Sequence, residues 1–243
     1  MRPVAGPTGC YGKLPARGDF LSRRLSASFV QSWDAWLQRA LQSSRDILGA
    51  HWLERYLSAP LWRFALAPGV AGGQPMAGVF LPSVDRVGRY FPFAIASPVA
   101  GRAIDLVRTL VQAEPWFDAL QEVALQALDP ALAVDAFDAR IEALVFPAHC
   151  AVPNRDSAWR ASSEERHAAI EDEAASAGVL ERLVKGMTPG AAWLSCRSEI
   201  SGSHAVATGA LPSGEMFCSM LDGEWQRHSS PASLHGQALE RPG

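Results

Sequence analysis

Three strand-like segments follow one another between residues 62 and 96, and this succession most constrains the fold. They cover residues 62–66, 77–81 and 91–96, where apolar side chains alternate with others or form a short run. Residues 9–14 alternate well enough to form a further strand. Strands that do not alternate regularly with helices are not typical of a parallel α/β sheet. The sequence therefore predicts an α+β fold with a mostly antiparallel sheet and helices on both of its faces.

Two helical patterns occupy the chain between the first strand and the later ones. Residues 29–44 place their large apolar side chains on one helical face, and Ser28 with Gln31 resembles a capping box before it. A second pattern, through Trp52, ends at Pro60. We expect both helices to pack on the sheet.

The second half is predicted to be largely helical. Pro115 fits the first position of a helix, and Asp129-Pro130 is expected to open another that continues to Val145. The remaining expectations are a solvated helix or mobile excursion over 153–177, a strand over 191–197 and a short helix over 213–221. Residues 1–227 are expected to form one domain and 228–243 a disordered tail.

Composition restricts the class of protein. The chain has 243 residues, of which 48% are hydrophobic and 19% charged, as in a soluble globular protein. No apolar run reaches membrane length, and the start has no secretory signal, so we expect a cytoplasmic protein without membrane insertion. The cysteines are far apart and are expected to be reduced, partly buried thiols: Cys10, Cys150, Cys196 and Cys218.

Charge is distributed unevenly along the chain. Residues 1–102 contain 12 Lys and Arg against 5 Asp and Glu, whereas residues 103–243 contain 10 against 20. Either the two halves neutralise each other within one fold, or the first half forms an electropositive face for an anionic partner. Nucleic acid is a poor candidate for that partner, because the first half has only one Lys and no dense basic run.

Two segments combine charged residues with aromatic residues, prolines and glycines. Residues 12–20 are GKLPARGDF, and residues 82–92 are PSVDRVGRYFP. The aromatic and proline positions between them are Trp33, Trp36, Tyr56, Pro60, Trp62 and Phe64. In this combination and spacing the chain resembles the TagF family, also called ImpM, of type VI secretion-associated proteins. The resemblance is dense over residues 9–97 and weaker as far as Trp225.

The resemblance implies a role that no residue pattern gives by itself. Members of this family repress assembly of the secretion machine after translation, by holding a scaffold protein with a forkhead-associated domain. It therefore implies a non-enzymatic cytoplasmic regulator with that scaffold as its partner. Some members are similar to fusions with a phosphatase, and no such extension is expected here. The oligomeric state stays open.

The two charged segments allow a structural and a functional interpretation. Asp85 could hold a turn by pairing with Arg86, Arg89 or Arg63, while Gly88 adopts a positive φ. Several arginines exceed what one carboxylate can satisfy, so Arg89 is predicted to face a partner, with Tyr90 and Trp62 as flat contact surface. The predicted partner-binding residues are Lys13, Arg17, Asp19, Arg23, Arg24, Arg86, Arg89 and Tyr90. The predicted structural residues are Gly12, Gly18, Trp62, Arg63, Asp85, Gly88 and Pro92.

No complete catalytic motif or metal-ligand spacing is present, and no cofactor is expected. Gly18 is expected to make a turn and Asp19 to cap backbone there. The alternative function is a small-anion binding protein or hydrolase that uses the same arginines for a phosphate or carboxylate. It would require a base or nucleophile that converges on them.

Overall fold

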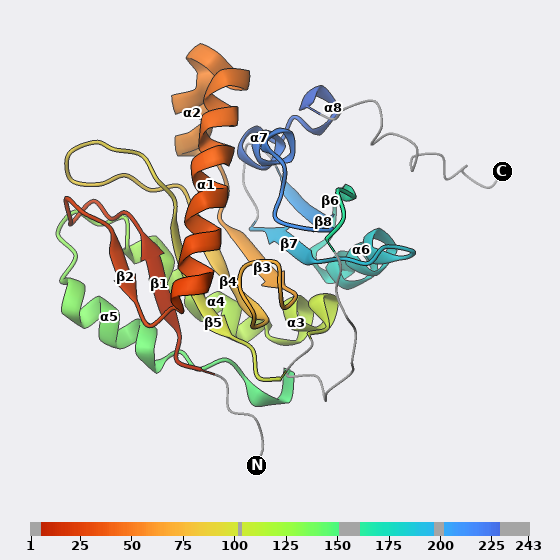
Figure 1. The fold of residues 1–243 in the computed structure, drawn as a ribbon, viewed down its shortest axis with the longest axis horizontal. Coiled ribbons are helices and arrows are strands. Elements are labelled where there is room, and N and C mark those ends of the chain that lie inside the picture. Colours follow the sequence, from red (N-terminus) through yellow and green to blue (C-terminus); the bar gives the residue numbers. More distant parts are fainter. Residues whose placement is uncertain (1–5, 102–103, 151–160, 197–201, 229–243) are drawn as a thin grey trace.

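The structure, a computed structural model, describes residues 6–101, 104–150, 161–196 and 202–228. Its centre is an eight-stranded sheet in the order β2-β1-β5-β4-β3-β7-β8-β6, and every pair of neighbouring strands described is antiparallel (Figure 1). The strands are β1 (Gly9–Gly12), β2 (Leu21–Arg23), β3 (Trp62–Leu66), β4 (Met76–Leu81), β5 (Phe93–Pro98), β6 (Glu165–Ile170), β7 (Ala191–Ser195) and β8 (Ser203–Thr208). The predicted α+β class with an antiparallel sheet is confirmed.

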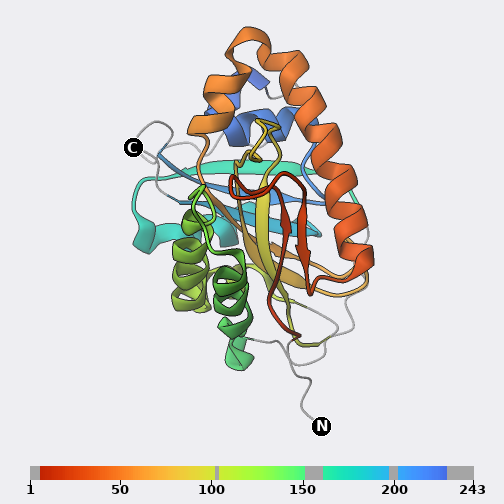
Figure 2. The same cartoon turned by 90° about the vertical axis from the view of Figure 1, so that its left-hand side faces the viewer.

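Helices cover both faces of this sheet, as Figure 2 shows. One face carries α1 (Ala27–Leu48), α2 (Trp52–Ser58), α7 (Gly214–Asp222) and α8 (Trp225–His228), and the other carries α3 (Leu106–Gln112), α4 (Glu114–Gln126), α5 (Val134–Ala143) and α6 (Ser176–Val184). Because successive side chains of a strand point to opposite faces, each strand contributes to two cores. In β3, Trp62 and Phe64 lie in the core under α1, whereas Ala65 lies in the core under α3 and α4.

Helix α1 begins earlier than predicted. The Ser26 hydroxyl accepts a hydrogen bond from the backbone N–H of Phe29, so Ser26 is the N-cap and Ser28 lies in the first turn. The predicted capping box at Ser28 is therefore wrong by two residues. The apolar face was predicted correctly: Trp33 is fully buried and its ring lies 4.8 Å from that of Phe64.

Residues 165–170 form the edge strand β6 instead of the helix or excursion predicted over 153–177. The prediction failed because the charged side chains here have partners on other elements. Arg166 donates to backbone carbonyls at the end of α6, and Glu165 accepts hydrogen bonds from Ser213. Residues 151–160 lie outside the described residues.

Helix α5 is shorter than predicted at both ends, covering Val134–Ala143. The Asp129 carboxylate accepts from the backbone N–H of Ala131, so it stabilises a turn before the helix and does not cap it. Val145 lies beyond its end. The predicted strand over 191–197 and the helix over 213–221 are confirmed within the described residues, and Gly223 ends α7 in the left-handed conformation.

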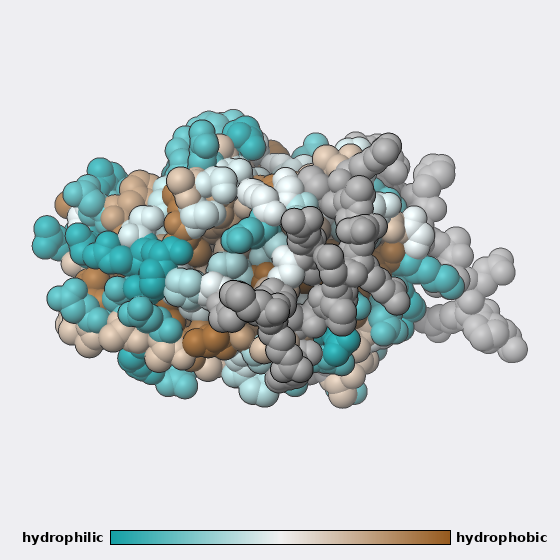
Figure 3. Space-filling model, turned by 60° about the horizontal axis from the view of Figure 1, so that its bottom comes forward, coloured by the Kyte–Doolittle hydropathy of each residue, from teal (hydrophilic) through white to brown (hydrophobic). Residues whose placement is uncertain are grey.

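The exterior mixes hydrophilic side chains with small apolar patches on the face shown in Figure 3. In the described part of the chain, no helix is both long enough and apolar enough to cross a membrane. Cys10, Cys150 and Cys218 are buried free thiols, and burial raises the pKa of Cys10 and Cys218 to about 12, which keeps both protonated near neutral pH. Of the predicted tail, residues 229–243 lie outside the described residues.

Candidate protein-binding face

Two loops that are far apart in the sequence lie against each other at one end of the sheet. We call residues 13–20 and 83–90 the paired loops; they follow β1 and β4 and lie at the upper left of Figure 1. The backbone N–H of Arg86 donates to the carbonyl of Arg17 at 2.9 Å. The Ser83 hydroxyl donates to the carbonyl of Lys13 at 2.7 Å. The two segments of the sequence that combine charged and aromatic residues thus form one continuous surface.

Asp85 organises this surface from below. Its carboxylate, which is fully buried, accepts from the Lys13 ammonium at 3.0 Å and from Arg89 Nε at 2.7 Å. It also accepts from the backbone N–H groups of Val87 and Arg89, at 3.0 and 2.9 Å. Burial acts to raise the pKa of this carboxyl, but the four hydrogen bonds outweigh it and hold the pKa well below its usual range. The structural interpretation of Asp85 is therefore supported, with Lys13 and Arg89 as its partners in place of Arg86 or Arg63.

Backbone geometry at two glycines permits this arrangement. Gly12 has a φ of +140°, and a Cβ there would lie 2.2 Å from the carbonyl oxygen of Pro92. Gly88 has a φ of +85° and donates its N–H to the carbonyl of Asp85, closing the second loop. The predicted positive φ of Gly88 is confirmed. Gly18 lies in a bend without a positive φ.

Tyr56 fastens the second loop to α2. Its hydroxyl donates to the carbonyl of Ser83 at 2.9 Å and accepts from the N–H of the same residue at 3.0 Å. Tyr90 is half-buried, with its ring 5.7 Å from Trp52 and 5.8 Å from Tyr56. The packed rings of Trp52, Tyr56 and Tyr90 thus fix the backbone of the second loop, from which its exposed side chains project.

Several residues predicted to contact a partner or to pair with Asp85 are used inside the fold. Lys13 is 7% exposed and forms an ion pair with Asp85, so the prediction that it contacts a partner is wrong. Arg24 forms an ion pair of 2.6 Å with Asp138 of α5. Arg63 pairs with Asp118 of α4, also at 2.6 Å.

Trp62 is 2% exposed, so its predicted role as flat contact surface is wrong. Its indole N–H donates to the carbonyl of Met220 on α7, which makes it a structural residue.

Arg89 is engaged although it is exposed. Besides its bond to Asp85, it donates to the carbonyl of Gly18 and lies 3.9 Å from the carboxylate of Asp19. Arg89 therefore bridges the paired loops, contrary to the expectation that it stays free. Asp19 is not the predicted backbone cap: its side chain is 94% exposed, and this long ion pair is its only interaction among the described residues.

Arg17 and Arg86 are the arginines that the paired loops leave available. Within the described residues, neither guanidinium has a hydrogen bond or an ion pair, and Arg86 is exposed. Two apolar side chains accompany them: Phe20, 42% exposed and stacked on Tyr11, and Val87, 65% exposed. Sequence reasoning missed Phe20 and Val87, although both stand directly beside charged motif residues. Arg23 is exposed at the end of β2, 3.8 Å from Asp138.

This geometry defines a class: an α+β protein with a rigidly held surface that combines exposed apolar side chains with arginines that have no ion pair among the described residues, a composition typical of protein interfaces. The sequence profile of the TagF N-terminal domain, described as type VI secretion system-associated, matches residues 9–144. The crystal structure of PA0076 from Pseudomonas aeruginosa PAO1 is 33% identical, covering 89% of this chain and 94% of that chain, with a TM-score of 0.65. No curated protein is significantly similar. The chain belongs to the TagF family of type VI secretion system-associated proteins.

Proposed function

We propose that this protein represses assembly of the type VI secretion system after translation, as a non-enzymatic cytoplasmic regulator. Its partner in this proposal is the forkhead-associated-domain scaffold protein of that system. Membership of the family supports the connection to type VI secretion. The partner and the repressor role are taken from the resemblance described above.

The paired loops are the proposed binding face. One observation carries this assignment. The same loops present Arg17 and Arg86, which have no carboxylate partner among the described residues, and the exposed apolar side chains of Phe20 and Val87. Arginine and aromatic side chains are enriched among the residues that contribute most to binding at protein interfaces, and a loop backbone that is already fixed loses little entropy on binding. An acidic patch on the scaffold would complement the two guanidinium groups.

The alternative, a hydrolase or small-anion site at the same arginines, has little support. The buried carboxylate of Asp85 lies within the paired loops, and it is the first candidate for a general base there. Because hydrogen bonds from Lys13, Val87 and Arg89 stabilise its ionised form, it is a weak base near neutral pH. We therefore expect no hydrolysis of phosphomonoesters, nucleotides or peptides by the purified protein.

The decisive experiment measures binding of purified scaffold protein by calorimetry or pull-down. We expect Arg17→Glu with Arg86→Glu to weaken binding at least about tenfold and to release secretion in cells. Thermal unfolding should stay close to that of the wild type, since surface substitutions change stability by about 0.5 kcal/mol or less. Wild-type binding should also weaken as salt rises, because screening is strong beyond about 8–10 Å.

Arg39→Glu is the control for each single variant, Arg17→Glu and Arg86→Glu, because all three change the net charge by the same amount. Arg39 is exposed on α1, outside the paired loops, and has no hydrogen bond or ion pair within the described residues. The same loss of binding in this control would show that only net charge matters. Unchanged binding in the double variant would place the interface elsewhere, and absence of binding by the wild type would reject the scaffold as partner.

A further inference from the structure

Phe20 is the one aromatic side chain of the paired loops that is exposed. It is 42% exposed, although its ring is stacked on that of Tyr11 at 5.4 Å and meets the ring of Phe91 edge-on at 4.9 Å. Tyr11 and Phe91 are themselves buried. The ring of Phe20 stays partly open because it directly precedes β2, the outermost strand described on this side of the sheet, so no further strand covers it.

The position of this ring is fixed by the fold. Besides its contacts with Tyr11 and Phe91, the Lys13 ammonium lies 5.2 Å from the centre of the Phe20 ring. Tyr11 is fixed in turn, because its hydroxyl donates to the carboxylate of Asp34 on α1 at 2.6 Å. A side chain that is already held in one orientation loses little rotamer entropy when a partner buries it.

The surroundings of Phe20 separate it from other exposed apolar side chains. Single exposed apolar residues are ordinary on protein surfaces and need no partner. Phe20, however, shares the paired loops with exposed Val87 and with Arg17 and Arg86, which have no carboxylate partner among the described residues. An aromatic residue accompanied by arginines is typical of the residues that dominate binding at protein interfaces.

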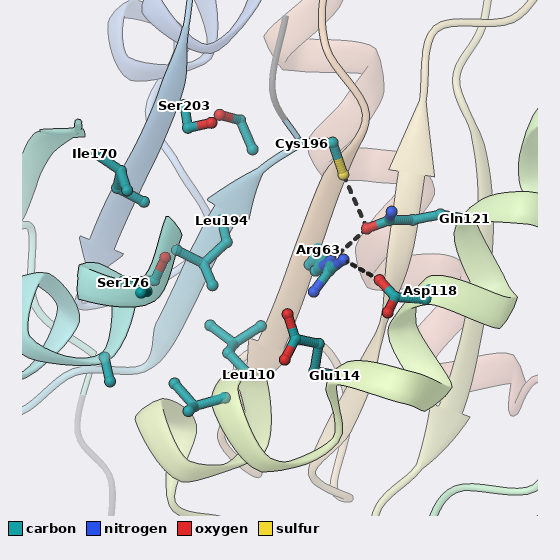
Figure 4. Close-up of a pocket in the computed structure, with 14 residues that line it drawn as sticks. Arg63, Leu110, Glu114, Asp118, Gln121, Ile170, Ser176, Leu194, Cys196 and Ser203 are labelled. Atoms are coloured by element: carbon teal, nitrogen blue, oxygen red, sulfur yellow. Dashed lines mark hydrogen bonds and ion pairs between the residues drawn. The ribbon is translucent and has the colours of Figure 1, made fainter. Parts of the chain in front are cut away.

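The exposed side chains of the paired loops project from them, and a cavity of about 680 Å³ lies elsewhere in the protein, between the sheet and α3, α4 and α6. None of the described residues that line this cavity belongs to the paired loops. Its arginine, Arg63, is already paired with Asp118 and Gln121 of α4 (Figure 4). Because the ring of Phe20 projects, the hollow that receives it belongs to the partner.

We infer that Phe20 is the anchor of the binding face and enters an apolar pocket of the partner protein, bordered by carboxylates that meet Arg17 and Arg86. This inference rests on the proposed function and specifies which contact gives the complex its lifetime. Exposed charges mainly change the association rate, whereas a buried aromatic anchor slows dissociation. The arginines therefore speed the encounter, and burial of Phe20 keeps the partner bound.

The test measures association and dissociation rates for the purified scaffold protein by surface plasmon resonance, at low and at physiological salt. We expect Phe20→Ala to raise the dissociation rate at least about tenfold, by the same factor at both salt concentrations, with little change in association. The double variant Arg17→Glu with Arg86→Glu should mainly lower the association rate, and this effect should shrink as salt rises. Leu125→Ala, which shortens an exposed apolar side chain on α4, should change neither rate.

Phe20→Leu controls for loss of folding, which a thermal melt of each variant measures. It keeps an apolar side chain against Tyr11 and Phe91 but lacks the flat ring, so it should melt close to the wild type and dissociate at least about threefold faster. This variant decides the question if Phe20→Ala does not fold.

Two failures are distinguishable. If the wild type binds the scaffold and the folded Phe20 variants dissociate as slowly as the wild type, or if Leu125→Ala dissociates as fast as they do, the assignment of Phe20 as the anchor is overturned and the proposed function stands. If the wild type does not bind the scaffold, the proposed function is rejected, and this inference with it.

Discussion

The buried carboxylate of Asp85 allows a sharp test of how the paired loops are held. Asp85→Ala removes the acceptor of four hydrogen bonds, two of them from the charged groups of Lys13 and Arg89. Arg89 is 56% exposed at its side chain and can turn toward water, whereas the side chain of Lys13 is only 8% exposed. The variant therefore leaves one ammonium buried without its counter-charge.

An uncompensated buried charge costs about 3–5 kcal/mol, more than the loss of a neutral hydrogen bond. For a protein of this size, each kcal/mol corresponds to roughly 2–4 °C in melting temperature, so we expect a decrease of about 6–20 °C. Urea unfolding followed by tryptophan fluorescence and a thermal melt would measure it. Asp19→Ala is the control: its carboxylate is 94% exposed and lies 3.9 Å from Arg89, so the change should be below about 0.5 kcal/mol.

A second variant identifies the cause. If the unpaired ammonium carries the cost, adding Lys13→Met to Asp85→Ala should restore part of the lost stability, because no buried charge then remains unpaired. The assignment of a buried ion pair is refuted if Asp85→Ala lowers the free energy of unfolding by less than about 1 kcal/mol. It is also refuted if the double variant loses as much stability as the two single variants added together.

Two further predictions concern the pH dependence of stability and the backbone conformation at Gly12. Because the folded-state pKa of Asp85 is depressed, the contribution of Asp85 to stability is complete above its unfolded pKa of about 3.9 and is lost as pH falls through the folded value. The difference in unfolding free energy between wild type and Asp85→Asn, measured by urea unfolding, should therefore shrink below about pH 4. A difference that does not change with pH would contradict this. Gly12→Ala should cost at least about 2 kcal/mol, because its Cβ would lie 2.2 Å from the Pro92 carbonyl at a φ of +140°. Gly73→Ala, which meets no atom within 4 Å, should change little, and equal melting temperatures for the two variants would show that Gly12 is not constrained.

The elements that could be predicted from sequence are those whose burial pattern is local. The strands predicted over 62–66, 77–81 and 91–96 and the apolar face of α1 follow from alternation and helical spacing, and all were found, the last strand two residues later, as Phe93–Pro98. Strand β8 contains only small and polar residues around Val206, and β6 is charged, so neither has a strong local pattern. They join the sheet because β8 pairs with β7 on one side and with β6 on the other.

The same limit applies to the candidate site. A structural role for Asp85, with Arg89 as one possible partner, could be inferred from the arginines near it in the sequence, but its second cationic partner could not. Lys13 lies 72 positions away in the sequence and reaches Asp85 only because β1 and β4 both pair with β5. Once Lys13 and Arg89 occupy the carboxylate, the available arginines are Arg17 and Arg86, a distribution that depends on three-dimensional contacts.

Of the two consequences considered for the opposite charges of the halves, internal neutralisation is observed in part, and the electropositive face for a partner stays a prediction. Part of the charge is neutralised internally, since Arg24, Arg55 and Arg63 of the first half pair with Asp138, Glu224 and Asp118 of the second. Arg63 of β3 and Arg24 after β2 are thereby joined to the covering helices α4 and α5, whereas the pair of Arg55 and Glu224 joins α2 to the residues between α7 and α8. The paired loops lie at the end of the sheet, where the acidic second half supplies no partner to Arg17 or Arg86 within the described residues. Arg17 and Arg86 are thus two of the first-half arginines whose charge is not neutralised by a carboxylate among the described residues, which is consistent with the proposed binding face.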